Sequence, residues 1–395
     1  MLAFTFPGQG SQRPQMGLPW VDHPSWELVA EASEIAGRDI AQLLLEADAE
    51  ELRQTRNAQL TTFVLSLVVL DAVERVGVTP ALCAGHSLGE YTALTATGAM
   101  SFEDGVRIVV ARGEAMQEAA NDNPGTMAAV LGLDDEAADV ACRRADGEVW
   151  VANFNAPGQV VIAGSNEGVQ AAGAAAKELG AKKVMPLPVG GAFHTPLMAP
   201  ARDELRKAIA QATIRDPDIA VVANIDARLH SDAEEWAGLL SAQLCSPVRW
   251  RQSVQLLVDE GVTEFVELGP GTVLSGMIKR IAPEAKISNV GVPDDIDKLL
   301  SSIATSPTGV STSVQDGEHL YMTERLVVSP SAGIFEPAER WRTQQDEAHI
   351  EVGELLGTVS GNEVRSRFSG VIMGLIAMDG ERVTASQPIA WLRTA

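Results

Sequence analysis

The chain has 395 residues, more than a single hydrophobic core usually holds, so at least two folding units are expected. Its 46% of hydrophobic and 21% of charged residues are typical of a globular protein with enough apolar material to build cores. The formal net charge of −23 argues against a nucleic-acid binder and against a protein that binds membranes through broad positive charge.

The start of the chain and its most apolar stretch give no sign of targeting to a membrane. Residues Met1 to Pro7 lack the basic flank and long apolar core of a signal peptide. The stretch from Leu60 to Leu70 contains hydroxyl residues and is too short to span a bilayer. The three cysteines lie far apart, without the close spacing of a zinc or redox motif. We therefore expect a cytoplasmic protein without a metal site.

Strand-like and helix-like patterns alternate in the first part of the chain. Strands are predicted over Leu2–Phe6 and Ala81–Gly85, and helices over Glu27–Ala36 and Thr61–Val76. Such alternation predicts a parallel sheet covered by helices, an α/β fold.

The middle of the chain, about residues 124–190, has a different order of elements. Strand, helix, strand, strand, helix and strand follow one another, which is the order of a ferredoxin-like fold. The predicted elements are Thr126–Leu131, Asp134–Ala145, Glu148–Ala152, Gln159–Ala163, Asn166–Leu179 and Lys182–Leu187. We expect a small ferredoxin-like subdomain inserted into the α/β domain, with a cleft at their border.

The composition changes again near the end of the α/β domain, which is predicted to cover residues 1–305. Residues 306–324 are rich in Ser, Thr and Gly and are predicted to be a linker. Beyond them, short β-rich runs separated by Gly and Pro predict an all-β module over residues 325–395.

The clearest chemical motif is Gly85-His86-Ser87-Leu88-Gly89, between a predicted strand and a predicted helix. This arrangement is typical of a nucleophile elbow, whose tight turn exposes the Ser87 hydroxyl. The N-terminus of the following helix also offers N–H groups to an oxyanion. Glycines that only serve a tight strand-to-helix crossover are the alternative.

A serine hydroxyl needs a base to become nucleophilic at neutral pH. His194 is the candidate, because it lies where the inserted subdomain is expected to rejoin the main domain; a capping or core histidine is the alternative. His86 would point away from Ser87 at the end of an extended strand. The remaining histidines lie in polar, loop-like surroundings and are given no role: His23, His230, His319 and His349.

Arg112 lies on an apolar stripe of a helix that Ser101 and Asp104 are predicted to cap, and that ends near Ala120. A buried guanidinium needs an anionic, preferably bidentate partner. The residues alone favour an Asp or Glu of this chain, with the carboxylate of a substrate as the alternative. The loop after the first strand, Pro7–Gln12, lacks the lysine and spacing of a phosphate loop, but its glycines let the N–H of Gln9 point into a site.

Seven blocks of the sequence, taken together, closely resemble the malonyl-CoA:acyl carrier protein transacylase family. The blocks are Phe6–Gln12, Gly85–Glu90, Arg112–Gln117, Asn153–Gln159, Phe193–His194, Gln243–Val248 and Glu267–Gly271. They cover about residues 1–304 in the order of the family. The resemblance implies an α/β-hydrolase-like acyltransferase core with an inserted ferredoxin-like subdomain.

The resemblance also implies a role for each matching residue. Ser87 would be the acylated nucleophile and His194 the general base, oriented by the main-chain carbonyl of Gln243. Gln9 and Leu88 would supply the N–H groups of the oxyanion hole. Arg112 would bind the free carboxylate of malonyl, which reverses the preference from the residues alone. Asn155 and Phe193 would also contact substrate, and the bulk of Phe193 would disfavour methylmalonyl.

The reaction implied is a ping-pong transfer of malonyl from malonyl-CoA, through Ser87, to the phosphopantetheine thiol of an acyl carrier protein in fatty acid or polyketide synthesis. No permanently bound cofactor, nucleic acid or membrane is expected. Local basic residues for an acidic carrier are Lys182, Lys183, Lys279 and Arg280, although a solvated face explains them equally well. The alternatives are a malonate decarboxylase transferase, a serine thioesterase on a related core, and a scaffold with a vestigial transferase.

The C-terminal module resembles a biotinyl or lipoyl carrier domain, which is a flattened β-barrel with a modified lysine on a hairpin tip. The tip falls near Ser360–Glu363, and no lysine follows Lys298. Biotin or lipoate therefore has no amine to which it could be attached. We expect a degenerate carrier fold that is kept for docking, oligomerisation or recruitment of a protein partner.

Overall fold

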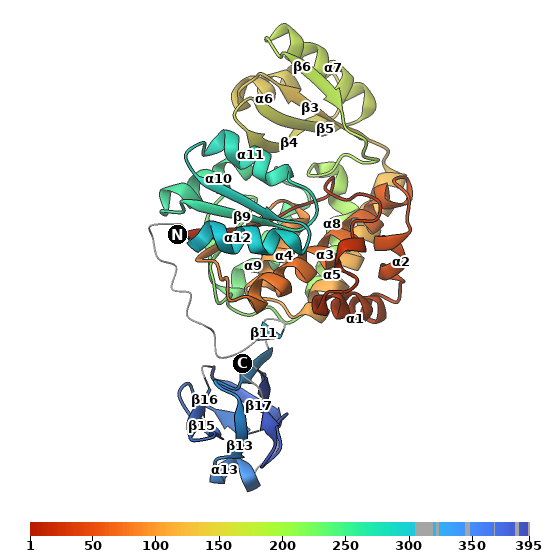
Figure 1. Ribbon diagram of the computed structural model, residues 1–395. Coiled ribbons are helices and arrows are strands. Elements are labelled where there is room, and N and C mark those ends of the chain that lie inside the picture. The colour runs from red at the N-terminus through yellow and green to blue at the C-terminus, as the bar shows by residue number, and fades with distance from the viewer. Residues whose placement is uncertain (305–318, 321–323, 344–347, 367, 384–386, 394–395) are drawn as a thin grey trace. The chain divides into compact units, whose positions relative to one another are not determined.

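The computed structural model describes residues 1–304, 319–320, 324–343, 348–366, 368–383 and 387–393 (Figure 1). The chain divides into two compact units, one of Met1–Leu70 with Pro80–Thr305 and the other of Asp71–Thr79 with Ser306–Ala395. Most of the predicted linker, residues 306–324, lies outside the described residues.

The first unit is built on a six-stranded sheet in the order β10-β9-β1-β2-β7-β8. All neighbouring strands are parallel except β8, which runs antiparallel to β7. The strands are β1 (Leu2–Phe6), β2 (Leu82–Gly85), β7 (Val221–Val222), β8 (Leu229–His230), β9 (Glu264–Leu268) and β10 (Lys286–Val290). In the register of β1 and β2, Phe6 is paired with Gly85. The loops that follow these two strands therefore leave the same edge of the sheet, where α/β proteins bind ligands.

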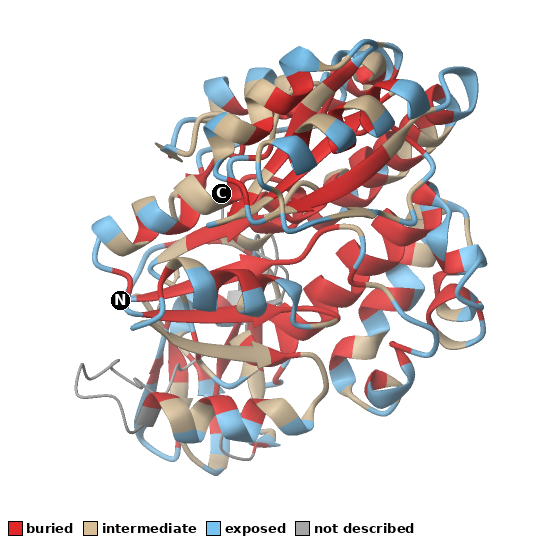
Figure 2. Cartoon of the chain, turned by 90° about the horizontal axis from the view of Figure 1, so that it is seen from above, coloured by how far each residue is buried: buried red, intermediate tan, exposed pale blue. Residues whose placement is uncertain are grey.

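Helices cover this sheet, and Figure 2 shows their inner faces buried and their outer faces exposed. Every residue of β1 is buried, as expected for a parallel strand covered on both faces. The helices are α1 (Glu27–Ala36), α2 (Ile40–Leu45), α3 (Thr55–Arg75), α4 (Leu88–Ala96), α5 (Phe102–Asp122), α8 (Ala199–Ile209), α9 (Ala233–Gln243), α10 (Trp250–Asp259), α11 (Val273–Ile281) and α12 (Asp294–Ala304). The prediction for α1 is confirmed, and so is the Ser101 cap of α5, where Ser101 Oγ accepts the Asp104 N–H at 3.0 Å.

Helix α3 begins six residues before the predicted helix, at Thr55 instead of Thr61. Its length and apolar composition would allow it to cross a membrane, but 94% of its most apolar stretch is buried inside the fold. Helix α3 is therefore a core helix of the fold.

A second, antiparallel sheet has the strand order β4-β5-β3-β6. In chain order its elements are β3 (Thr126–Leu131), α6 (Asp135–Arg144), β4 (Val149–Ala156), β5 (Gln159–Gly164), α7 (Asn166–Glu178) and β6 (Lys183–Pro186). The two helices and the strands share one apolar core. The edge strand β4 is joined to the rest of the unit through Val248, whose carbonyl accepts the Phe154 N–H and whose N–H donates to Ala152, both at 2.9 Å.

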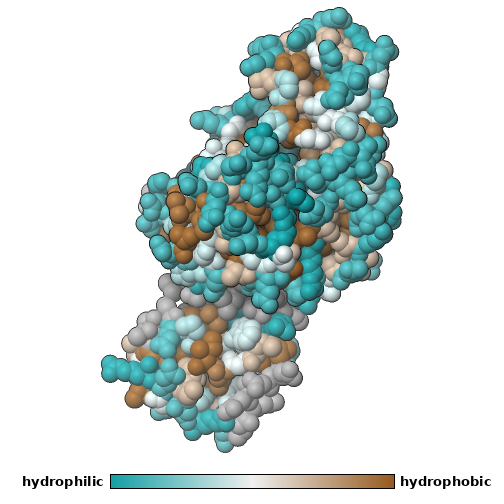
Figure 3. All heavy atoms as spheres, turned by 90° about the vertical axis from the view of Figure 1, so that its right-hand side faces the viewer, coloured by the Kyte–Doolittle hydropathy of each residue, from teal (hydrophilic) through white to brown (hydrophobic). Residues whose placement is uncertain are grey.

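The second unit consists mainly of short antiparallel strands in two sheets, with the orders β11-β12-β19-β17-β14 and β16-β15-β13-β18. Its elements are β11 (His319–Leu320), β12 (Glu324–Val328), β13 (Gly333–Pro337), α13 (Glu339–Thr343), β14 (Ala348–Ile350), β15 (Leu355–Val359), β16 (Asn362–Arg365), β17 (Gly370–Leu375), β18 (Arg382–Val383) and β19 (Pro388–Arg393). They enclose an apolar core that includes Phe335, Trp341 and Leu392. Figure 3 shows apolar atoms exposed on one face of this unit.

Candidate active site

Ser87 lies on a sharp turn between β2 and α4, at φ 53° and ψ −102°. Positive φ is strained for a residue with a side chain, and strain of this kind is typical of functional sites. The flanking glycines are required by close backbone packing. A Cβ at Gly85 would lie 1.9 Å from the Gly89 carbonyl, and one at Gly89 would lie 2.0 Å from the Phe6 oxygen. The sequence motif therefore corresponds to a true elbow, packed on the loop after β1.

His194 lies beside this serine, in the segment that leads back from the second sheet to α8. The Ser87 Oγ is 2.7 Å from His194 Nε2, and the Nδ1–H of His194 donates to the main-chain carbonyl of Gln243 at 3.0 Å. This bond to the carbonyl fixes the tautomer and leaves Nε2 as a proton acceptor. Burial, followed by the nearby Arg112 charge, lowers the pKa of His194 to about 3. The imidazole is therefore neutral at physiological pH and ready to act as a base.

Arg112 reaches the same serine from α5. Its side chain is 1% exposed, and one terminal nitrogen donates to Ser87 Oγ at 3.1 Å and to Gln243 Oε1 at 3.0 Å. The other terminal nitrogen donates to Gln59 Oε1 at 2.6 Å, and Nε has no hydrogen-bond partner among the described residues. Burial lowers the pKa of Arg112, which means that the cation is held away from water. Its hydrogen-bond partners are neutral, so the carboxylate partner expected from the residues alone is not found in the described part of the chain.

Three polar residues of the site were missed in the sequence. Gln59 lies at the start of α3 and is fully buried. In the sequence, an amide within an otherwise apolar helix could have indicated that it belongs to the site. Asn224 follows β7 and braces the elbow, because its Oδ1 accepts the Ser87 N–H and its Nδ2 donates to the Gly85 carbonyl, both at 2.7 Å. Glu90 lies in the first turn of α4 and is 1% exposed. In the sequence, a carboxylate directly after the elbow, in an otherwise apolar helix, could have indicated a buried functional group.

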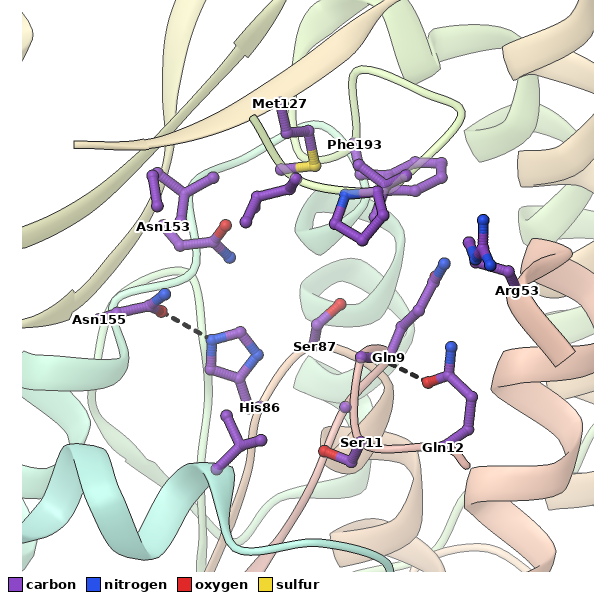
Figure 4. A pocket seen from close by; sticks show the side chains of 18 of the residues that line it. Gln9, Ser11, Gln12, Arg53, His86, Ser87, Met127, Asn153, Asn155 and Phe193 are labelled. Atoms are coloured by element: carbon purple, nitrogen blue, oxygen red, sulfur yellow. Dashed lines mark hydrogen bonds between the residues drawn. The ribbon is translucent and has the colours of Figure 1, made fainter. Parts of the chain in front are cut away.

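A cavity of about 490 Å³ opens above Ser87, between the loop after β1, the second sheet and α11 (Figure 4). Gln9, Phe193, Asn155 and His194 line it with Ser87. Leu88 is the first residue of α4, where the backbone N–H has no partner within the helix. His86 also lines the cavity and hydrogen-bonds with Asn155 Oδ1 at 2.9 Å. Its ring is thus directed away from Ser87, toward the opposite wall.

One of the four basic residues considered for carrier docking, Arg280, is held in hydrogen bonds within the chain. Lys182, Lys183, Lys279 and Arg280 are all exposed. Arg280 also donates to the Pro157 carbonyl at 2.7 Å and to the Gln159 side chain. Arg280 therefore joins α11 to the turn between β4 and β5. Within the described part of the chain, no three His, Cys, Asp or Glu side chains are grouped so that they could hold a metal ion.

Comparison with known proteins identifies relatives of this arrangement. Residues 3–292 match the family model of the acyl transferase domain. The chain is 42% identical over 307 residues to the malonyl CoA-acyl carrier protein transacylase of Bacillus subtilis (strain 168), a match that covers 76% of this chain and 97% of the relative.

Solved structures give the same result. The acyl-carrier-protein S-malonyltransferase of Burkholderia pseudomallei 1710b is similar with a TM-score of 0.74 and 43% identity, covering 76% of this chain and 99% of that one. A malonyl-transacylase solved in complex with its type II polyketide synthase acyl carrier protein is similar with a TM-score of 0.74 and 38% identity, covering 76% and 99%. The family match ends before the second unit's β-strands begin.

Proposed function

The chain belongs to the acyl transferase domain family, as a malonyl-CoA:acyl carrier protein transacylase, and we propose on this premise how its own residues carry out the transfer. Malonyl passes from malonyl-CoA to the protein, and then to the phosphopantetheine thiol of an acyl carrier protein. The observation that carries the assignment of residues is the convergence of Ser87, His194 and Arg112, whose side chains meet at the Ser87 hydroxyl.

In the first half-reaction, His194 Nε2 takes the proton of Ser87 as Oγ attacks the thioester carbonyl of malonyl-CoA. The N–H groups of Gln9 and Leu88 stabilise the oxyanion that forms. When the carbon–sulfur bond breaks, the protonated His194 gives its proton to the CoA sulfur. Malonyl is then esterified to Ser87, and His194 is neutral again.

The second half-reaction reverses this sequence with a different thiol. His194 takes the proton of the phosphopantetheine thiol, and the sulfur attacks the ester carbonyl. As the ester bond breaks, the proton returns to Ser87 Oγ. Nucleophile and base come from the chain itself, so the reaction needs no permanently bound cofactor.

Arg112 selects the acyl group through its free carboxylate. The guanidinium is buried, its hydrogen-bond partners are neutral, and within the described ranges its Nε has no partner, so it is suited to a bidentate anion. Pairing with malonyl would also keep the acyl-enzyme shielded from water until the thiol arrives. Phe193 lines the cavity above Ser87, and its bulk disfavours a branched α-carbon. Asn155, on the opposite wall, contacts the arriving thioester.

We also propose a fold for the inserted subdomain and for the second unit. The strand order β4-β5-β3-β6 supports a ferredoxin-like insert over about residues 124–190 of an α/β-hydrolase-like core in residues 1–305. The two-sheet second unit, with its hairpin turn at Ser360 and Gly361, supports a flattened barrel of the biotinyl or lipoyl type over residues 325–395. Without a lysine it would carry neither biotin nor lipoate, and it would serve a protein partner instead. We also propose a cytoplasmic location for the enzyme.

A transfer assay tests the proposed function. The protein is mixed with labelled malonyl-CoA and either a fatty acid or a polyketide carrier protein bearing phosphopantetheine. We expect label on the carrier, and loss of this transfer in the Ser87→Ala variant. Release of free malonate at the same rate without carrier would support a thioesterase instead. Transfer only to the carrier of a malonate decarboxylase would support that system.

A further inference from the structure

We propose that Glu90 is a positioning residue that serves this site in place of a triad carboxylate. It acts on His194 and Arg112 through Gln243, and on Ser87 through Asn224. The inference rests on the proposed function and assigns a role to a buried group that the transfer mechanism does not use.

The contacts of Glu90 require two acceptor oxygens. Its Oε1 accepts the backbone N–H of Asn224 at 2.6 Å, and its Oε2 accepts an amide N–H of Gln243. Both neighbours are donors, so an ionised carboxylate satisfies both, whereas an amide or a protonated acid would place a donor against a donor. The geometry therefore favours the charged form of a fully enclosed side chain.

The contact of this carboxylate with Gln243 sets the orientation of that amide, which is fully buried at the end of α9. The Gln243 amide nitrogen donates to Glu90 and to the Ser87 carbonyl, so its Oε1 is left to accept from Arg112. A flipped amide would turn N–H groups toward the guanidinium. The main-chain carbonyl of the same residue holds His194. Glu90 thus fixes the residue on which both the base and the carboxylate-binding cation depend.

The contact of Glu90 with Asn224 holds the segment after β7 against the elbow. Through its backbone N–H, Asn224 is bound to Glu90, and its side chain bridges the Ser87 N–H and the Gly85 carbonyl. Because Ser87 has a strained positive φ, the elbow needs such a brace to keep its geometry. One carboxylate therefore supports nucleophile, base and cation together.

Glu90 also differs from His194 in the pH range where it titrates. Charged and titratable groups near it are Arg112 from α5, Asp226 from the connection between β7 and β8, and Tyr91 of its own helix. Burial, the largest effect, raises the pKa of Glu90 to about 7, and the Asp226 charge adds to the increase while Arg112 opposes it. The pKa of His194 is held at about 3. Loss of activity on acidification through pH 7 would therefore report Glu90 and not the base.

The test is the pH dependence of kcat/KM for malonyl transfer between pH 5.5 and 8.5 in the wild type and in Glu90→Gln. We expect the wild-type value to fall about tenfold for each pH unit below about 7, since one proton removes one acceptor. Glu90→Gln has lost that acceptor at every pH. Its kcat/KM should be about 10- to 100-fold lower at pH 8 and should not show this acid limb.

Glu264→Gln is the matched control. Glu264 is also a buried carboxylate, but it lies at the start of β9, where it pairs with Lys286 at 3.3 Å, at the sheet edge opposite the site. This variant should be less stable to heat and keep the wild-type pH profile. A wild-type profile without the acid limb overturns the inference even if Glu90→Gln does not fold, and so does a Glu90→Gln profile that keeps the limb. A wild type that moves no malonyl at any pH contradicts the proposed function instead.

Discussion

Replacing Arg112 by Met is expected to abolish the preference for malonyl while sparing the transfer of acetyl. Arg112 is 1% exposed, and Met fills much of its volume without a charge. Two charge-assisted hydrogen bonds to the malonyl carboxylate are worth about 1.5 to 3 kcal/mol each, together about 3 to 6 kcal/mol. At about 1.4 kcal/mol per factor of ten, kcat/KM for malonyl-CoA should fall by roughly 10² to 10⁴.

The assay compares kcat/KM for malonyl-CoA and acetyl-CoA in the same preparations of wild type, Arg112→Met and Arg112→Lys. Acetyl has no free carboxylate, so its transfer measures any general damage to the site. Arg112→Lys keeps the charge but loses the planar fork, and we expect it to fall between the other two proteins. Equal losses for malonyl and acetyl, or undiminished malonyl transfer in Arg112→Met, would refute the role of the guanidinium.

Two further predictions follow from the same site. The pKa of His194 is lowered from 6.5 to about 3 by folding, so the folded state binds fewer protons between these values and loses stability as the pH falls through this range. Urea unfolding at pH 7 and pH 4 should show a loss about 3 kcal/mol larger in wild type than in His194→Gln, and equal losses would contradict this burial effect. Phe193→Ala should improve methylmalonyl transfer relative to malonyl by about tenfold in a competition assay, and an unchanged ratio would remove Phe193 as the selecting residue.

Local features of the site could be predicted because neighbouring residues determine them. The elbow at Ser87 could be predicted from the two glycines that flank it, which permit the tight turn between strand and helix. The cap at Ser101 likewise depends only on residues of the same helix turn. In both cases the residues that form the motif lie within a few positions of one another in the sequence.

The partners of Arg112 could not be predicted in this way. Sequence patterns showed that its guanidinium is buried, but the choice between a carboxylate and the amides of Gln59 and Gln243 depends on residues 53 and 131 positions away. The start of α3 was missed for a related reason. Its first turns contain polar residues, Thr55, Asn57 and Gln59, which are buried by tertiary contacts although their composition suggests a loop.

The contact that His86 makes could not be predicted from the sequence either, although its ring is directed away from Ser87 as expected. The ring lines the cavity and hydrogen-bonds with Asn155 on β4. That bond links the main sheet to the second sheet across the cavity. Contacts between two sheets depend on how they pack, which the periodicity of either one does not contain.

A mass spectrum of the acid-quenched protein, taken after a brief exposure to malonyl-CoA without carrier, shows whether Ser87 is acylated. We predict one malonyl group on the peptide containing Ser87, which disappears when a carrier protein bearing phosphopantetheine is added and reappears on that carrier. A malonyl group on any other residue, or transfer to the carrier with no labelled protein at any time, would contradict it.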